Sequence, residues 1–161
     1  MIQLRGIDRT FGTNQVLTDV SFDIKPGRMT GFVGANGAGK TTTMRIILGV
    51  LDPTAGSVQV DGAPITADYR ARIGYMPEER GLYPKMPIDD QLVYLARLHG
   101  LDQKMARRRA LDLLDRLGLG DRHHDTLESL SLGNQQRAQI AAALVHDPAA
   151  LVLDEPFSGL D

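Results

Sequence analysis

The 161-residue sequence contains no cysteine and no tryptophan, and aromatic residues make up only 5% of it. Without cysteine there can be no disulfide framework and no thiolate metal site, and a reducing compartment fits this composition. No apolar run approaches the roughly 20 residues that cross a bilayer, and residues 1–6 lack an apolar signal core. The net charge of −2 gives no bulk electrostatic argument for a nucleic acid or an anionic membrane as partner.

The composition is that of a globular protein, with 42% hydrophobic and 24% charged residues. This length suits one domain with a substantial core. Short apolar runs alternate with helix-like repeats along the chain. The runs predict strands at 2–7, 20–24, 29–33, 57–60, 72–76 and 150–153, and the repeats predict helices at 42–51, 89–99, 110–117 and 130–146. Such alternation predicts an α/β fold with a largely parallel sheet.

The most informative stretch is Gly34-Ala35-Asn36-Gly37-Ala38-Gly39-Lys40-Thr41, between an expected strand and an expected helix. Its G-x-x-x-x-G-K-T spacing is that of a phosphate-binding P-loop. Glycines let successive backbone N–H groups face one anion, and the following helix directs its positive end there. Lys40 adds a charge near the β- and γ-phosphates, and the Thr41 hydroxyl is an oxygen ligand for Mg²⁺. The pattern predicts nucleotide binding; the alternative is a glycine-rich turn that begins a helix.

A second candidate lies near the C-terminus, where the apolar run 150–153 leads into two carboxylates. Asp154 could hold Mg²⁺ together with Thr41, and Glu155 could polarise an attacking water. An acidic pair at a strand end also occurs without any chemical role, so this alternative stays open. Phe11 and Val16 flank a short loop, where an aromatic more often packs at a strand end than stacks on a ligand.

Four elements of the chain, in this order, resemble the nucleotide-binding subunit of an ABC transporter. They are Gly34–Thr41, the run Leu130-Ser131-x-Gly133-x-Gln135-Gln136-Arg137, Leu151–Pro156, and Ser158-Gly159-Leu160-Asp161. The Ser-x-Gly-x-Gln-Gln element separates this family from other P-loop enzymes. The sequence most resembles bacterial exporters of the drug-resistance and sodium-extrusion type.

The resemblance implies a P-loop NTPase fold of the ABC ATPase kind. This fold has a mainly parallel core sheet, an N-terminal antiparallel β part, and a helical signature subdomain at about 85–147. Residues 1–161 would form one nucleotide-binding domain. The family places a switch histidine on a strand after the crossing loop, and all four histidines here precede Asp154. We therefore expect a chain truncated at its C-terminal side, with C-terminal core strands missing.

The resemblance also implies a role for each site residue. Phe11 would stack on adenine, which reverses the strand-end interpretation, and Glu155 would be the catalytic general base. The implied nucleotide-binding residues are Phe11, Val16, Gly34, Ala35, Asn36, Gly37, Ala38, Gly39, Lys40, Thr41 and Thr42. The implied metal ligands are Thr41, Glu78 and Asp154, with Glu78 standing where the family commonly has Gln.

The signature residues Ser131, Gly133 and Gln135 would contact the nucleotide bound by the opposite subunit. Leu132 replaces the usual first glycine of this motif and Asn134 a usual glutamine, whereas the serine and the second glycine are present. Asp161 would lie on the loop that crosses between subunits. Without the family, Ser131 is simply a suitable helix N-cap.

The resemblance implies ATP and Mg²⁺ as cofactors, and ATP hydrolysis that powers transport, in the export direction. It implies two partners, a membrane-spanning permease subunit and a second nucleotide-binding subunit in a homodimer, with no nucleic acid. The protein would be cytoplasmic and peripheral on the inner face of the cell membrane, held there only through the permease. The alternatives are a soluble ABC ATPase that acts in translation or on DNA, and a nucleotide-binding fragment without turnover.

Overall fold

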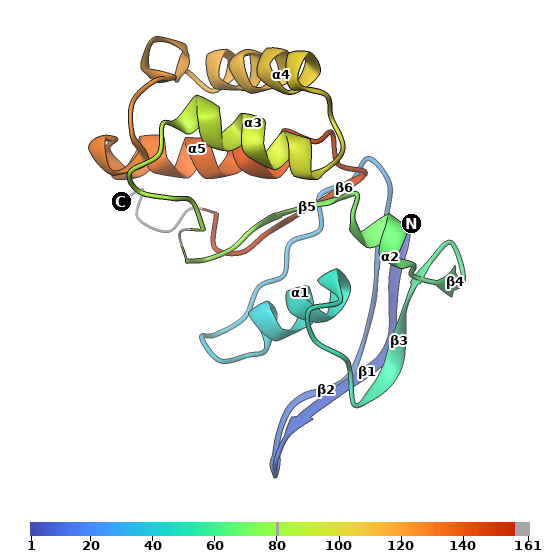
Figure 1. Cartoon of the computed structure of the whole chain (residues 1–161). Coiled ribbons are helices and arrows are strands. Elements are labelled where there is room, and N and C mark those ends of the chain that lie inside the picture. Colours follow the sequence, from blue (N-terminus) through green and yellow to red (C-terminus); the bar gives the residue numbers. More distant parts are fainter. Residues whose placement is uncertain (80, 157–161) are drawn as a thin grey trace. The chain divides into compact units, whose positions relative to one another are not determined.

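The computed structural model describes residues 1–79 and 81–156 of the chain. They divide into two compact units, one within residues 1–71 and the other within residues 72–156. Figure 1 labels their helices and strands. The expectation that both units belong to one nucleotide-binding domain stays a prediction.

The first unit is built on an antiparallel sheet with the strand order β2-β1-β3-β4. The strands are β1 (Ile2–Phe11), β2 (Asn14–Ile24), β3 (Ala55–Val60) and β4 (Ala63–Pro64). β1 pairs with β2 from Ile2↔Ile24 to Phe11↔Asn14 and with β3 from Ile2↔Val60 to Asp8↔Ala55, with bulges in both ladders. β1 is therefore an interior strand with a long partner on each side, and its side chains Leu4 and Ile7 are fully buried.

Two helices complete the first unit, α1 (Lys40–Leu48) and α2 (Ala67–Arg70). α1 begins after Gly39 and ends at Gly49, and both glycines have a left-handed backbone. Such a conformation costs glycine little because it has no Cβ. Ile46 and Ile47 are the buried apolar residues of α1.

The strand expected at residues 29–33 is not formed, so that prediction was wrong. Residues 28–35 carry no regular secondary structure, and Met29 and Val33 are 99% and 97% exposed. Phe32 instead packs its ring 5.5 Å from the ring of Phe22. A strand needs a hydrogen-bonded neighbour, and no described residue pairs with this segment in a ladder. The apolar run alone does not reveal whether a partner strand lies beside it in the part of the chain that the structure describes.

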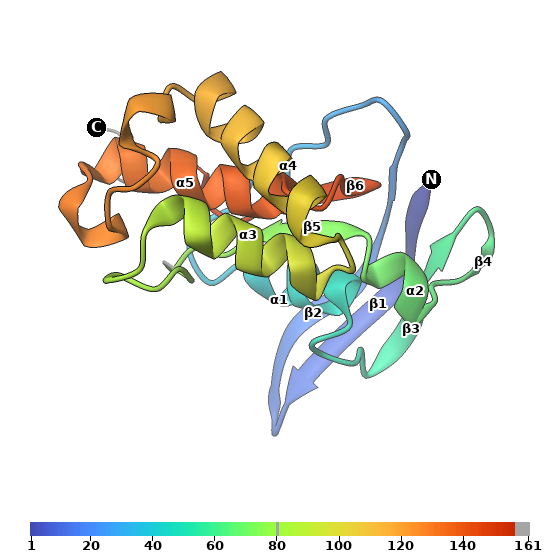
Figure 2. The ribbon, with the colours of Figure 1, turned by 45° about the horizontal axis from the view of Figure 1, so that its top comes forward.

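The second unit contains a parallel pair of strands and three main helices. β5 (Ile73–Met76) pairs with β6 (Ala150–Leu153) from Ile73↔Ala150 to Met76↔Leu153. The helices are α3 (Ile88–Leu98), α4 (Gln103–Arg116) and α5 (Leu132–Leu144), with short 3₁₀ turns at Gly120–Arg122 and Leu127–Ser129. Figure 2 shows the three helices from a second side.

The core of the second unit lies between its helices. Leu92 and Ala96 of α3, Ala110 and Leu114 of α4, and Ala138 of α5 are completely buried in one apolar cluster. The pairs Leu92/Ala96 and Ala110/Leu114 are each four residues apart, which is the helical repeat that the sequence shows. Below this cluster α5 approaches β5 closely, because a Cβ placed on Gly74 would overlap the carbonyl oxygen of Ala143.

The structure confirms the mixed α/β architecture, with an antiparallel N-terminal part and parallel strands after it. The expected helices are present, and α4 begins earlier than its apolar repeat suggests. α2, β4 and the two 3₁₀ turns are additional. No helix among residues 1–79 and 81–156 is long and apolar enough to span a membrane.

Candidate functional site

The P-loop runs from Gly34 into the first turn of α1. Gly37 and Gly39 have φ angles of 82° and 84°, which are left-handed values that side chains with a Cβ rarely adopt. The Ala38 N–H donates to the Ala35 carbonyl at 3.1 Å and so closes the turn. Ala35, Asn36 and Gly37 are exposed. The loop therefore presents an open backbone surface directly before a helix N-terminus, which suits an anion.

Lys40 is the first residue of α1, and its side chain folds back over the loop. The Lys40 ammonium donates to the carbonyl oxygens of Gly34 at 2.8 Å and Ala35 at 3.3 Å. Thr41 and Thr42 follow it and are half-buried. The next residue, Thr43, is buried and bonds the Gly39 carbonyl through its hydroxyl at 2.9 Å. The cation is thus already held above the loop, where the β- and γ-phosphates of a nucleotide would bind.

The β1–β2 hairpin packs against the end of this loop. A Cβ on Gly39 would overlap the side chain of Leu17 and come within 3.4 Å of Val16. Phe11 ends β1, pairs with Asn14 at the tip of the hairpin, and is 45% exposed. All eleven residues predicted to bind nucleotide therefore lie in the first unit, with the Phe11 ring accessible to a ligand.

Asp154 follows β6 in the second unit, and its N–H donates to the Met76 carbonyl at 2.9 Å. Its side chain is 1% exposed, and its Oδ2 atom has no hydrogen-bond partner among the residues that the structure describes. An unsatisfied buried carboxylate oxygen is costly unless something binds it. A hard divalent cation such as Mg²⁺ meets that need with oxygen ligands, so this position fits the metal.

Glu155 is exposed and has a φ angle of 48°, a left-handed value for a residue with a Cβ. A non-glycine residue held in this region costs on the order of 1–3 kcal/mol and is often found at a functional site. The strand β6 ends at Leu153, and residues 154–156 form a bend and a turn. The Gln136 amide of α5 donates to the next carbonyl, that of Pro156, at 2.6 Å.

Glu78 lies two residues after β5 and is exposed. The segment that follows leads to an open depression of about 690 Å³. The lining residues are Tyr83, Pro84, Lys85, Met86, Pro87 and Glu128. Gln91 shapes this segment, because its buried amide bonds the backbone of Tyr83 and the carbonyl of Met86.

The signature residues surround the start of α5. Ser131 is the N-cap, and its hydroxyl accepts from the Asn134 N–H at 3.4 Å while remaining exposed. Gly133 is half-buried. Gln135 is only 7% exposed, and its amide donates to the Leu130 carbonyl at 2.9 Å. Ser131 is thus available at the surface, whereas Gln135 supports the helix start from inside.

His146 follows α5 and stacks on His99, the residue after α3, with ring centroids 3.8 Å apart. Burial lowers the pKa of His146 below its usual value, and the charge of His99 lowers it further. The pair therefore joins the ends of α3 and α5 best when His146 is uncharged.

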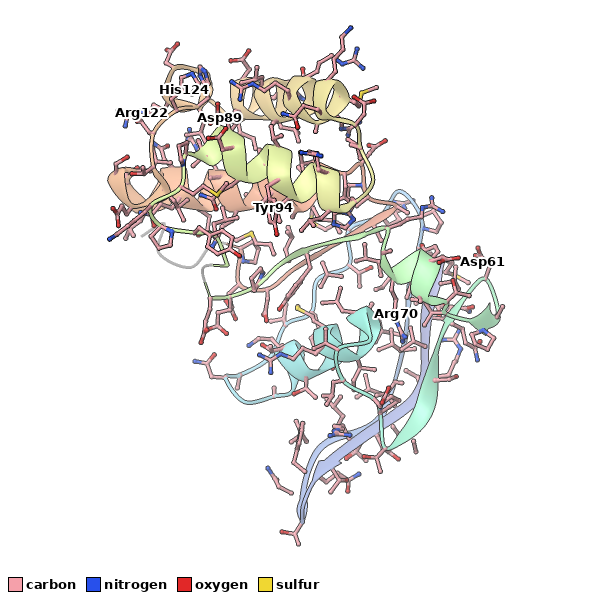
Figure 3. All side chains as sticks on the ribbon, in the orientation of Figure 1. Asp61, Arg70, Asp89, Tyr94, Arg122 and His124 are labelled. Carbon is pink, nitrogen blue, oxygen red and sulfur yellow. The ribbon has the colours of Figure 1, made fainter. Side chains whose placement is uncertain are left out.

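A cluster that sequence reasoning missed lies at the start of α3, where Figure 3 shows Asp89 beside His124. The Asp89 carboxylate is 1% exposed and lies 3.2 Å from Arg107 and 3.0 Å from His124. Ligand atoms of Asp89, His123 and His124 lie within 4.8 Å of one another, a spacing that could hold a metal. Arg107 already supplies the positive charge that such a metal would bring. The cluster therefore joins α3, α4 and the 120–125 turn electrostatically.

The residues predicted from the sequence fall into two sets. The nucleotide-binding residues and Thr41 lie in the first unit, and Glu78, Ser131, Gly133, Gln135, Asp154 and Glu155 lie in the second. The predicted crossing-loop residue Asp161 lies outside the described residues. The P-loop and the buried carboxylate after a parallel strand are features of the P-loop NTPase class.

The ABC transporter family matches residues 17–158 of this chain. The chain is 47% identical over 161 residues to the uncharacterized ABC transporter ATP-binding protein YhaQ of Bacillus subtilis (strain 168), covering 100% of this chain and 54% of YhaQ. It is 36% identical over 163 residues to the Nod factor export ATP-binding protein I of Burkholderia orbicola (strain AU 1054), covering 99% and 54%. The chain thus spans about half the length of these relatives.

A solved structure shows the same architecture. It is the dimeric post-hydrolysis state of the ATP-binding cassette MJ0796 bound to ADP and Pi, with a TM-score of 0.86 and 26% identity. The match covers 100% of this chain and 76% of the MJ0796 chain. The chain belongs to the ABC transporter family, and its fold is that of the ATP-binding subunits.

Proposed function

We propose that the full-length protein binds and hydrolyses MgATP and powers export through a membrane-spanning partner. The observation that carries this proposal is the buried Oδ2 atom of Asp154 after β6, which has no hydrogen-bond partner among residues 1–79 and 81–156, in a chain that also has a complete P-loop. A P-loop binds phosphates, and a carboxylate at a strand end holds their metal. Together the two features supply the parts of a nucleotide hydrolase.

Each residue has a defined part in this proposal. The P-loop N–H groups and Lys40 neutralise the phosphates, and the Phe11 ring stacks on adenine. Thr41, Asp154 and Glu78 hold Mg²⁺, which draws charge from the transferring phosphoryl group. Glu155 accepts a proton from the attacking water. The exposed Ser131 and Gly133, two residues further on, contact the nucleotide of a second copy.

The partners follow from the family and from two exposed features. A dimer is supported by the dimeric MJ0796 structure and by the exposure of Ser131 at a helix N-terminus. The depression that Tyr83 and Met86 line is the proposed contact with the permease subunit. Export is supported by similarity to the Nod factor export protein. The protein would then lie on the cytoplasmic face of the membrane, held by its permease.

The test is Glu155→Gln in the full-length protein, with Glu79→Gln as the matched control. Glu79 is exposed like Glu155 and has no proposed part in the site. Removal of a general base lowers a rate by about 10²–10⁴-fold. The turnover of the Glu155→Gln variant should therefore fall at least about 10²-fold. ATP affinity should stay unchanged, and MgATP should leave the variant as a dimer on a sizing column. Turnover within a few-fold of the wild type would reject Glu155 as the base.

A further inference from the structure

Arg9 and Phe11 lie two residues apart on β1 and therefore on the same face of the strand. The guanidinium carbon of Arg9 lies 4.4 Å from the centroid of the Phe11 ring. A cation within about 6 Å of a ring face is attracted by the negative charge of the π-system. The Arg9 cation therefore covers the ring that the proposed function assigns to adenine.

Arg9 is fixed on its other side, independently of Phe11. Its Nη1 atom donates to the Asp52 carbonyl at 2.8 Å, in the loop that follows α1. The same loop is tied to β1 by two further bonds, from Thr54 N–H to the Asp8 carbonyl at 2.8 Å and from Thr10 N–H to the Thr54 hydroxyl at 3.0 Å. The Arg9 Nε atom is buried. The guanidinium is thus held between the loop that follows α1 and the β1–β2 hairpin.

The Phe11 ring lies at an exposed position near the tip of the hairpin. It is 45% exposed, and the next residue, Gly12, turns the hairpin with a φ angle of 59°. A side chain at the exposed tip of a hairpin loses rotamer freedom when it binds a ligand, and that loss weakens binding. A fixed cation over one face holds the ring in place, while Phe11 remains 45% exposed.

We propose that Arg9 is a positioning residue for the nucleotide base. It acts through Phe11: it fixes the ring and draws π-electron density toward the guanidinium, so that adenine stacks on the opposite face. The inference rests on the proposed function, because it requires that Phe11 contacts adenine. Arg9 would thus contribute to the choice of base, although it lies outside the P-loop.

The experiment compares two ligands in the full-length protein, ATP and inorganic tripolyphosphate, by titration calorimetry. Tripolyphosphate offers the same phosphate charges without a base. Arg9→Ala should weaken ATP binding roughly two- to fivefold, the equivalent of one exposed cation–π contact, and leave tripolyphosphate binding unchanged. Arg9→Gln keeps a donor for the Asp52 carbonyl but removes the cation, and it should weaken ATP binding equally.

The matched control is Arg5→Ala. Arg5 lies on the same strand, and its guanidinium pairs with Asp23 at 2.7 Å. This variant should bind both ligands as the wild type does. Equal weakening of ATP and tripolyphosphate by Arg9→Ala would indicate a general structural effect and overturn the proposal.

Phe11→Ala separates the two levels of the inference. If Phe11→Ala weakens ATP binding and Arg9→Ala or Arg9→Gln does not, the positioning role of Arg9 is wrong and the adenine contact stands. If Phe11→Ala leaves ATP binding unchanged, the adenine contact itself is wrong, and the inference about Arg9 is wrong with it. Absence of any ATP binding by the wild type would reject the proposed function.

Discussion

The Gln136 side chain donates a hydrogen bond to the Pro156 carbonyl at 2.6 Å. This bond joins α5, which begins at the exposed Ser131, to the turn that carries Glu155. Both residues lie in the second unit, so the helix and the proposed catalytic turn are mechanically connected. A displacement of α5 would therefore reach the residue proposed to activate water.

Gln136→Ala should lower ATP turnover more than ATP affinity, because it frees the turn that positions Glu155. A neutral hydrogen bond contributes about 0.5–1.5 kcal/mol, so we expect a roughly two- to tenfold decrease in kcat. Gln103→Ala is the matched control, since Gln103 is exposed at the start of α4. The measurement is steady-state hydrolysis by the full-length proteins. An unchanged kcat for Gln136→Ala would show that the Gln136–Pro156 hydrogen bond does not contribute to turnover.

Gly74→Ala should strongly destabilise the second unit. The added methyl group would overlap the Ala143 carbonyl oxygen and contact Leu151 and Pro148. α5 and β5 would have to move apart, and overpacking of this kind costs about 1–3 kcal/mol. Chemical denaturation of the full-length protein measures the change. Gly81→Ala is the control, because among the described residues its Cβ would meet Pro77 alone, at 3.5 Å. Equal midpoints for the two variants would show that the close approach of α5 and β5 does not require glycine at position 74.

The His99–His146 stack should make stability depend on pH. The pKa of His146 is lowered in the folded protein, chiefly by burial, so the unfolded chain takes up a proton first as pH falls. Stability should therefore decrease as pH falls through about 6.5, the ordinary histidine pKa. Urea unfolding between pH 7.5 and 5.5 measures this decrease. His146→Gln should reduce the pH dependence, and an identical dependence in both proteins would refute the assignment.

Sequence periodicity predicts the helices well, because α3, α4 and α5 each bury a regular apolar face in one core. It fails at residues 29–33, where an apolar run has no strand partner among the described residues. The P-loop could be found because its residues are consecutive. Arg9 could not, since its importance comes from the Asp52 carbonyl and the Phe11 ring, which only the folded chain brings to it.

Asp89 illustrates the same limit. In the sequence it is one acidic residue in the first turn of a helix, where negative charge is common. In the structure it is buried beside the Arg107 guanidinium and the His124 ring, from two other segments. By contrast, the sequence does predict that Asp154 lies at the end of a strand, because the apolar run 150–153 precedes it directly.

The measurement that tests the account most directly is ATP binding by Lys40→Ala in the full-length protein. Lys40 already lies over the loop carbonyls of Gly34 and Ala35, and its loss removes a charge-assisted contact of about 1.5–3 kcal/mol. We predict that the Kd for ATP rises roughly ten- to over a hundredfold. The control is Arg45→Ala, because Arg45 is an exposed residue of the same helix; this variant should bind ATP as the wild type does. An unchanged Kd for Lys40→Ala would contradict the assignment of residues 34–41 as the nucleotide phosphate site.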